Sequence, residues 1–358
     1  MGNSHHLEEI KKAIEKFPKV RLIHLPTPLQ PLRNISKEMD GVNLFVKRDD
    51  LTGLAFGGNK SRKLEFIIRD ALQRKADVII TWASLQSNWC LQTAVASRMF
   101  GLTPVLVLFK PPDVSADVDG NLLLDRLVKA DIRVQEQETA GVMKMEDVEI
   151  VLYGVVREVK EWGHTPYIAP IGGSMVGGSM EKPLGAISYV QAFFEMTEQA
   201  EALGVQVQTV IHASGSGGTQ AGLVVGAKAV GGHTRILGIS VSEEKGAYRE
   251  DVLRIARDTA GALELPVETE EEDVIVLDDY IGEGYGQVYP EITEVISWTA
   301  MKEGIFLDPV YTGKAMFGLK DLARKGTFSP GENVVFFHTG GTPAHVPFRN
   351  RLRFSPGE

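Results

Sequence analysis

Lys60 lies between a glycine pair and two further cations, in a segment (residues 57–63) that reads Gly-Gly-Asn-Lys-Ser-Arg-Lys. Neighbouring positive charge and burial both favour the neutral form of a lysine amine. A neutral amine can attack a carbonyl group and form a Schiff base. Lys60 is therefore a candidate nucleophile. The alternative is an ordinary turn followed by a helix whose cationic face is solvated.

A second segment combines glycines with hydroxyl groups, as anion sites do. It follows an apolar run, precedes an apolar helical pattern, and consists of Ser214, Gly215, Ser216, Gly217, Gly218 and Thr219. Glycines let the backbone approach an anion, and the free N–H groups of a helix N-terminus can bind it. The segment matches neither the dinucleotide fingerprint nor the Walker A loop. We therefore expect a phosphate monoester here, with a tight strand-to-helix turn as the alternative.

Further side chains are candidates for substrate contacts. Ser87 and Asn88 open a helical pattern, where their donors could hold a carboxylate; a simple helix cap is the alternative. Tyr285 lies in a Gly-Tyr-Gly turn and Tyr311 precedes a helix, so each could line a pocket or exchange a proton. His338 is expected to be structural. No cluster of His, Cys, Asp and Glu residues has the spacing of a metal site.

Alternating apolar runs and helical patterns predict an α/β protein. The first series predicts strands at residues 77–81, 104–109, 132–135 and 166–170, and the second at 207–213, 236–241 and 333–338. Helical patterns between and after these strands predict two parallel sheets with covered faces. Ligands bind at the carboxyl ends of such strands. Residues 84–88, 214–219 and 339–341 should therefore surround one cleft.

Composition limits the classes of partner. The chain has 358 residues and a net charge of −9, which argues against nucleic acid or an anionic membrane as the main partner. It contains no apolar run as long as a membrane span and no signal-peptide core. The single cysteine, Cys90, cannot form an internal disulfide. We therefore expect a cytoplasmic protein with a small-molecule substrate.

Together these motifs resemble the family that contains D-cysteine desulfhydrase and 1-aminocyclopropane-1-carboxylate (ACC) deaminase. These are pyridoxal-phosphate (PLP) enzymes of the tryptophan synthase β fold type. The resemblance runs from residues 25–29 to residues 338–341 and is most specific at residues 47–53, 57–64, 86–88, 214–222 and 308–311. It implies PLP as cofactor, a homodimer, and two open twisted parallel-sheet domains. The larger would comprise residues 1–64 and 173–358, and the smaller residues 65–172.

The resemblance also implies a role for individual residues. Lys60 corresponds to the Schiff-base lysine, and Lys63 and residues 215–219 to the phosphate cradle. Asn88 corresponds to the partner of the cofactor's phenolic oxygen and Ser87 to the substrate-carboxylate contact. Tyr285 and Tyr311 correspond to the two active-site tyrosines, and Thr339 to a residue near the pyridine nitrogen.

Two departures from the family pattern bear on the reaction. Thr312 follows Tyr311, where ACC deaminases carry a glutamate. A threonine can hydrogen-bond a neutral pyridine but cannot hold a proton there as an ionised partner would, which favours β-elimination over ACC deamination. Trp89 and Leu91 stand where the family has histidine and arginine. Trp89 either contacts the substrate or faces the helix core.

The expected activity is therefore PLP-dependent α,β-elimination on a small amino acid. D-cysteine or a β-substituted relative is the expected substrate, giving a 2-oxoacid, ammonia and the leaving group. The alternatives on the same cofactor are ACC deamination, sulfo-lyase activity on cysteate, and racemisation. A non-catalytic protein that binds PLP or another phospholigand is the alternative from a different class.

Overall fold

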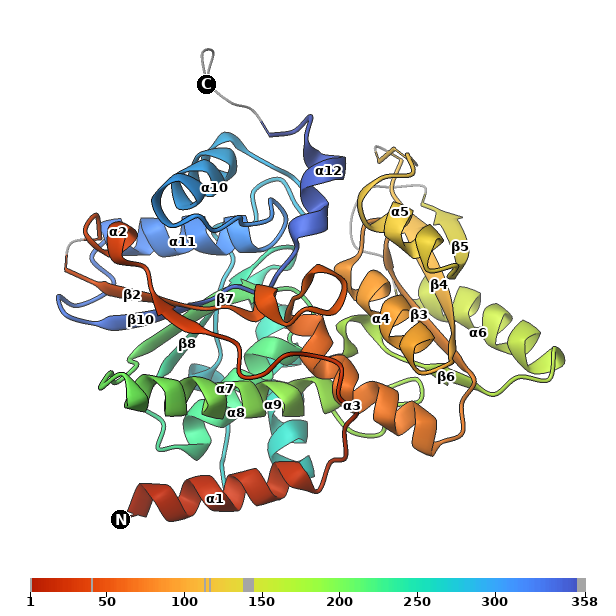
Figure 1. Cartoon of the computed structure of the whole chain (residues 1–358), viewed down its shortest axis with the longest axis horizontal. Coiled ribbons are helices and arrows are strands. Elements are labelled where there is room, and N and C mark those ends of the chain that lie inside the picture. The colour runs from red at the N-terminus through yellow and green to blue at the C-terminus, as the bar shows by residue number, and fades with distance from the viewer. Residues whose placement is uncertain (1, 40, 113, 116, 138–144, 353–358) are drawn as a thin grey trace.

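Two α/β units lie side by side, each built around its own sheet (Figure 1). The computed structural model describes residues 2–39, 41–112, 114–115, 117–137 and 145–352. The predicted α/β class with two parallel-sheet domains is confirmed. Within the described residues, no helix combines the length and apolar character needed to cross a membrane.

The larger sheet has six strands in the order β1-β2-β10-β7-β8-β9. Their bounds are β1 Leu29–Pro31, β2 Asn43–Lys47, β10 Asn333–Phe337, β7 Thr209–Ser214, β8 Arg235–Ser240 and β9 Ile275–Leu277. All neighbouring strands are parallel except β1, which pairs antiparallel with β2 at the sheet edge. Phe336 of β10 lies opposite both Val46 of β2 and Ile211 of β7. An N-terminal strand thus completes a sheet made mainly by the C-terminal half of the chain.

Helices cover both faces of this sheet. They are α2 (Arg33–Ser36), α7 (Leu184–Ala202), α8 (Gly218–Ala229), α9 (Lys245–Ala262), α10 (Pro290–Glu303) and α11 (Thr312–Arg324). Side chains of β10 alternate between the faces: Val334 and Phe336 pack in the core under α10 and α11, and Val335 and Phe337 pack against α7 and α8. Burial on both faces explains why the strand is almost wholly apolar.

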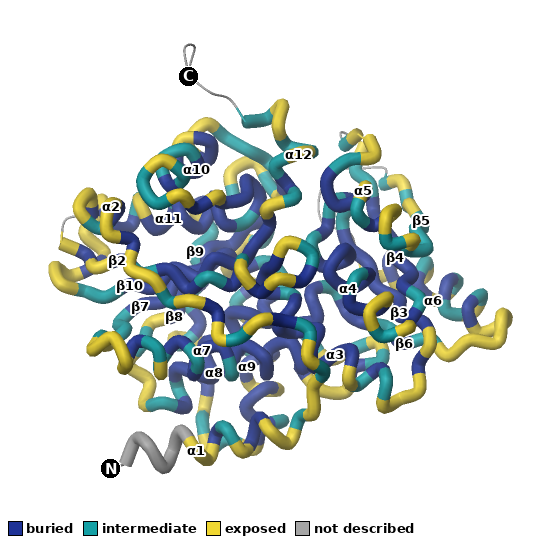
Figure 2. The backbone as a smooth tube through the Cα atoms, in the orientation of Figure 1, coloured by how far each residue is buried: buried dark blue, intermediate teal, exposed yellow. Residues whose placement is uncertain are grey.

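The smaller sheet has four parallel strands in the order β5-β4-β3-β6. The strands are β3 (Val78–Ser84), β4 (Thr103–Lys110), β5 (Asp131–Glu136) and β6 (Pro166–Ile168), and the helices are α3 (Asn59–Gln73), α4 (Asn88–Met99), α5 (Gly120–Leu127) and α6 (Met145–Glu161). Ile80 and Trp82 of β3 pack under α6, whereas Ile79 and Ala83 face the core that contains α3 and α4. The buried strands and helices appear as dark segments in Figure 2.

The remaining elements lie near the ends of the chain or are single short turns. They are α1 (Gly2–Glu15), α12 (His345–Phe348), and single 3-10 turns at Asp49–Leu51, Leu54–Phe56, Ile171–Gly173, Glu271–Asp273 and Thr342–Ala344. Helix α3 continues without a break through residue 65, and the Ile171–Gly173 turn returns the chain after β6. Near the C-terminus, α12 lies across from α5 of the smaller unit (Figure 1), where Arg349 pairs with Asp119 at 2.7 Å.

Candidate active site

Lys60 lies in the first turn of α3, directly after the glycine pair. Gly57 and Gly58 have φ angles of 74° and 130°, which glycine adopts at little cost. A Cβ on Gly58 would lie 2.9 Å from the carbonyl oxygen of Thr339. The backbone N–H of Asn59 donates to that same oxygen at 3.0 Å. The glycines therefore let the chain after β10 pack against the turn that carries Lys60.

The Lys60 amine is poised to lose its proton. Burial lowers its pKa from 10.5 to about 8. No hydrogen bond or ion pair from any described residue engages this amine. We expected neighbouring positive charge to lower the pKa of Lys60, but it lowers that of Lys63 instead. Burial, and next the charge of Lys60, hold the pKa of Lys63 well below its usual range. Burial alone thus accounts for the reactive state of Lys60.

The alternative of a solvated cationic face is wrong. Ser61, Arg62 and Lys63 are 0%, 2% and 0% exposed. Arg62 is paired with Asp49 and with Glu195, each at 2.8 Å. The first turn of α3 is therefore buried. Arg62 is held there by its two carboxylate partners, and Lys63 by the turn at residues 172–174.

The segment from Ser214 to Thr219 forms the turn between β7 and α8. Gly217 has a φ angle of 79°, and α8 begins at Gly218, so the N–H groups of its first turn have no helical partner. Asn59, next to Lys60, donates from Nδ2 to Thr219 Oγ1 at 3.1 Å. The predicted anion loop thus lies beside the predicted nucleophile. The Ser214 hydroxyl bonds instead to core side chains.

Lys63 joins this loop through a serine that sequence reasoning missed. Its Nζ donates to the Gly172 carbonyl at 3.0 Å and to Ser174 Oγ at 3.2 Å. Ser174 Oγ is 2.8 Å from Ser216 Oγ. From sequence, residues 172–178 are interpreted only as a loop and a candidate domain crossing, because the contact of Ser174 with Ser216 joins segments far apart in the chain. Ser174 is therefore an additional candidate for the anion site.

The two predicted tyrosines are in contact. Their hydroxyl oxygens are 2.5 Å apart, and Tyr285 OH is also 3.3 Å from Ser84 Oγ at the end of β3. Loss of hydration raises the pKa of both Tyr285 and Tyr311, so both hydroxyls keep their protons at neutral pH. A Cβ on Gly215 would lie 3.7 Å from the Tyr311 ring. The tyrosine pair therefore bridges the anion loop and the smaller unit.

Ser87 is the N-cap of α4, and its Oγ accepts from the Cys90 N–H at 3.2 Å. Ser87 thus caps the helix, as the alternative interpretation predicted. Its role in binding the substrate stays a prediction. Asn88 follows it, and its Oδ1 accepts from Asn121 Nδ2 at 2.9 Å. Cys90 is fully buried, and burial raises the pKa of its thiol.

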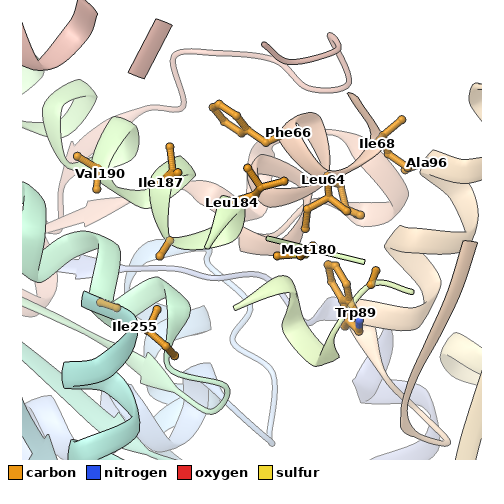
Figure 3. Packing of buried hydrophobic residues seen from close by; sticks show 14 of the residues in the cluster. Leu64, Phe66, Ile68, Trp89, Ala96, Met180, Leu184, Ile187, Val190 and Ile255 are labelled. Atoms are coloured by element: carbon orange, nitrogen blue, oxygen red, sulfur yellow. The ribbon is translucent and has the colours of Figure 1, made fainter. Parts of the chain in front are cut away.

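Trp89, predicted as a possible substrate contact, faces the core. It is 2% exposed, and its indole N–H donates to Thr81 Oγ1 at 2.7 Å. It belongs to the apolar cluster that contains Leu64 and Met180 (Figure 3). Of the two positions considered from sequence, Trp89 therefore takes the one in the core. There its ring packs against apolar side chains and its N–H has a hydrogen-bond acceptor.

Thr312 and Thr339 differ in what their hydroxyls do. Thr312 Oγ1 donates to Asp308 Oδ1 at 2.7 Å and accepts from the Asp308 N–H at 2.7 Å. The Thr312 hydroxyl proton is therefore directed at Asp308, and a contact between Thr312 and the pyridine nitrogen stays a prediction. The Thr339 hydroxyl has no hydrogen-bond partner among the described residues. His338 beside it is structural: Nδ1 accepts from Gly340 and Nε2 bonds to a backbone carbonyl.

Gln92 of α4 is a further residue that the sequence did not single out. Its Nε2 donates to the Gly57 carbonyl at 2.8 Å, and its Oε1 accepts from Ser61 Oγ at 2.7 Å. One buried amide thus holds both flanks of Lys60 from the smaller unit. No group of three or more described His, Cys, Asp or Glu residues is arranged to hold a metal ion.

Lys60 thus lies next to a residue that contacts the candidate anion loop, and the tyrosine pair packs against the same loop. A family model described as pyridoxal-phosphate dependent enzyme matches residues 20–340. The chain belongs to this family of PLP-dependent enzymes. PLP is thus its cofactor, and the predicted resemblance is confirmed.

Relatives of this PLP-dependent enzyme include both kinds of protein in the predicted family. A Pyrococcus furiosus protein with the provisional name 1-aminocyclopropane-1-carboxylate deaminase is 40% identical over 349 residues, covering 96% of this chain and 98% of the relative. D-cysteine desulfhydrase of Klebsiella pneumoniae is 36% identical over 342 residues, covering 95% and 98%. The crystal structure of an ACC deaminase homologue superimposes with a TM-score of 0.85 at 36% identity, covering 96% and 98%.

The site fits the charge of the PLP phosphate. Lys63 is a buried amine whose bonded partners, Gly172 O and Ser174 Oγ, are both neutral. A phosphate group bound beside Ser174 and Ser216 would supply the missing negative charge. The free N–H groups at the start of α8 add donors for the same phosphate.

Proposed function

We propose that this enzyme catalyses α,β-elimination on a small amino acid and that D-cysteine or a close β-substituted relative is its substrate. The observation that carries the proposal is the surroundings of Thr312. This residue is neutral, and the Asp308 carboxylate behind it already accepts hydrogen bonds from four donors. Among the described residues, no other ionised side chain is bonded to Thr312, so none there matches the glutamate that would hold a proton on the pyridine nitrogen. The free Thr339 hydroxyl supports Thr339 as the donor to that nitrogen.

PLP supplies an electron-withdrawing ring that weakens the bonds at the α-carbon of an attached amino acid. Lys60 would hold the cofactor, and once the substrate amine had taken its place the freed Lys60 amine would be positioned to accept the α-proton, alone or with the help of a tyrosine. As the Cα–H electrons form a new C=C bond, the Cβ–S bond breaks and the thiolate leaves. The hydroxyl pair of Tyr285 and Tyr311 holds a proton for that leaving group, and Ser87 binds the substrate carboxylate. Water then converts the released enamine to pyruvate and ammonia.

The test is product analysis with D-cysteine, L-cysteine and ACC as separate substrates. We expect sulfide, pyruvate and ammonia from D-cysteine, and no product from the Lys60→Ala variant, which should still fold. Full turnover by Lys60→Ala would overturn the role of Lys60. A wild-type enzyme that binds PLP but yields no sulfide from either cysteine would overturn the proposed reaction.

ACC deamination is the second candidate, because relatives and the superimposed structure carry that name. It is separated by its product, 2-oxobutyrate with ammonia and no sulfide. Thr312→Glu restores the carboxylate that ACC deaminases carry. If this variant gains ACC activity while losing cysteine activity, the argument from Thr312 is supported; if wild type already prefers ACC, the argument fails.

We also propose the domain limits, the assembly and the location expected above. The larger domain comprises residues 1–64 and 173–358, the smaller residues 65–172, and two copies form a homodimer. The single, buried Cys90 supports a reducing compartment such as the cytoplasm. Light scattering after size-exclusion chromatography tests the dimer, and cell fractionation tests the location.

A further inference from the structure

Asn121, in the first turn of α5, is buried and holds the start of α4. Its backbone N–H donates to Gln86 Oε1 at 2.9 Å. Its side-chain Nδ2 donates to the Gln86 carbonyl oxygen at 2.8 Å and to Asn88 Oδ1 at 2.9 Å. Asn121 thus makes a direct contact with the residue that we expect to bind the cofactor's phenolic oxygen.

The Gln86 carbonyl decides which way both amides point. A backbone carbonyl oxygen can only accept, so the Asn121 atom next to it is Nδ2. The same Nδ2 faces the Asn88 side chain, which must then present its oxygen to Asn121. The N–H groups of Asn88 are directed away from Asn121 as a result. Reversing the Asn121 amide would set its oxygen against the Gln86 carbonyl and lose both hydrogen bonds.

The other end of the Asn121 amide has no such support. Its Oδ1 is buried and has no hydrogen-bond partner among the described residues. An unpaired buried oxygen costs stability. A leucine would remove that cost but would leave the Gln86 carbonyl and Asn88 Oδ1 without the Nδ2 donor, so the reason for an asparagine here lies in what its Nδ2 holds.

We propose that Asn121 is a positioning residue that keeps the Asn88 N–H groups, not its oxygen, available to the phenolic oxygen of PLP. This inference rests on the proposed role of Asn88. An ionised phenolic oxygen can only accept, so Asn88 binds it in this orientation and would repel it in the other. A donor also draws charge from that oxygen and weakens its hold on the proton of the neighbouring Schiff-base nitrogen.

The test is a pH titration of the visible absorbance of lysine-bound PLP, without substrate. In Asn121→Leu we expect the midpoint to move to higher pH and the dissociation constant for PLP to rise about tenfold. Asp125→Leu is the matched control, because Asp125 is also a buried polar residue of α5 but its carboxyl oxygens bond to no described residue. It should leave the midpoint unchanged. Asn121→Ser, whose hydroxyl is too short to reach Asn88, replaces the leucine variant if that variant fails to fold.

A double variant decides whether Asn121 acts through Asn88. Asn88→Ala alone should move the midpoint in the same direction, and adding Asn121→Leu to it should cause no further shift. Additive shifts, a wild-type midpoint in Asn121→Leu, or no response to Asn88→Ala would each overturn the inference. Because the titration needs no turnover, failure of the elimination reaction would not affect it.

Discussion

Lys60 and Lys63 are three residues apart in one helical turn but have different environments. Lys60 reaches a position with no bonded partner among the described residues, and its pKa falls to about 8. Lys63 is held by a carbonyl and a serine hydroxyl beside the anion loop. The first environment suits a nucleophile, and the second suits a counter-ion for a phosphate.

The pKa of Lys60 predicts how fast the apoenzyme captures PLP. Only the neutral amine attacks the aldehyde, so the capture rate should fall about tenfold per pH unit below pH 8 and level off above it. Stopped-flow absorbance at a series of pH values measures this rate. Lys60→Ala should give no visible band. A rate that keeps rising to pH 10, as for an ordinary lysine with a pKa of 10.5, would contradict the prediction.

Lys63 should contribute to affinity for the phosphate rather than for the ring. Replacing it with methionine removes a charge-assisted contact worth roughly 1.5–3 kcal/mol, so PLP affinity should drop by about 10- to 100-fold. Fluorescence or absorbance titration measures the effect. Pyridoxal, which lacks the phosphate, should bind both proteins equally. An equal loss for both ligands would instead mean that Lys63 supports the fold of the site.

Single residues show where sequence reasoning stops. Lys60, Tyr285 and Tyr311 were predicted because their local motifs are distinctive. Ser174 and Gln92 were missed because each acts through a contact with a segment more than thirty residues away. Local pattern carries no information about such contacts, so only the folded chain reveals them.

At the scale of elements, the strands of both series lie within a few residues of their predicted positions. The elements not predicted from the pattern include β1 and β9, which have three residues each. Three residues are too few to establish an alternation. Strand β2 (Asn43–Lys47) was also missed, and it joins the sheet only through its distant partner β10. The order of strands in a sheet follows from such pairings and not from local propensity.

The packing of α5 against α4 leaves Asp125 buried, with neither carboxyl oxygen bonded to a described residue. Burial raises its pKa from 3.8 to about 8. In the folded protein Asp125 therefore stays protonated over a pH range where it ionises in the unfolded chain. The folded state thus loses stability as pH rises from about 4 to about 8, by at most roughly 6 kcal/mol.

Asp125→Asn removes this titration while keeping the shape of the side chain. We expect its stability advantage over wild type to grow between pH 5 and pH 8 and to level off above that range. Urea unfolding at several pH values gives the comparison. A constant difference between the two proteins would show that Asp125 ionises normally in the folded state.

At the scale of the whole molecule, a buried charge network joins parts of the chain that are distant in sequence. Arg62 of α3 pairs with Asp49 and with Glu195 of α7, and Lys47 of β2 also contacts Glu195. Tyr189 donates to Asp49 at 2.6 Å. Two cations and two carboxylates balance each other, so removing one partner leaves a buried charge unpaired.

Arg62→Leu should therefore destabilise the protein by about 3–5 kcal/mol. Denaturant unfolding measures the loss. Arg74→Leu, on the same helix, is the matched control because its ion pairs with Asp70 and Glu181 are largely exposed, and it should change stability far less. Similar losses in the two variants would mean that the network is not what anchors α3.

Gln92 ties the position of the reactive amine to the opening of the cleft. Its amide belongs to the smaller unit but grips the backbone on one side of Lys60 and the Ser61 hydroxyl on the other. Suppose that the two sheets rotate apart to admit a substrate. The lysine turn would then stay with the larger sheet, because Asn59 bonds there to Thr339 and to Thr219 of the anion loop, and the two Gln92 hydrogen bonds would be lost. Opening of the cleft and release of the turn that carries the nucleophile would therefore be a single event.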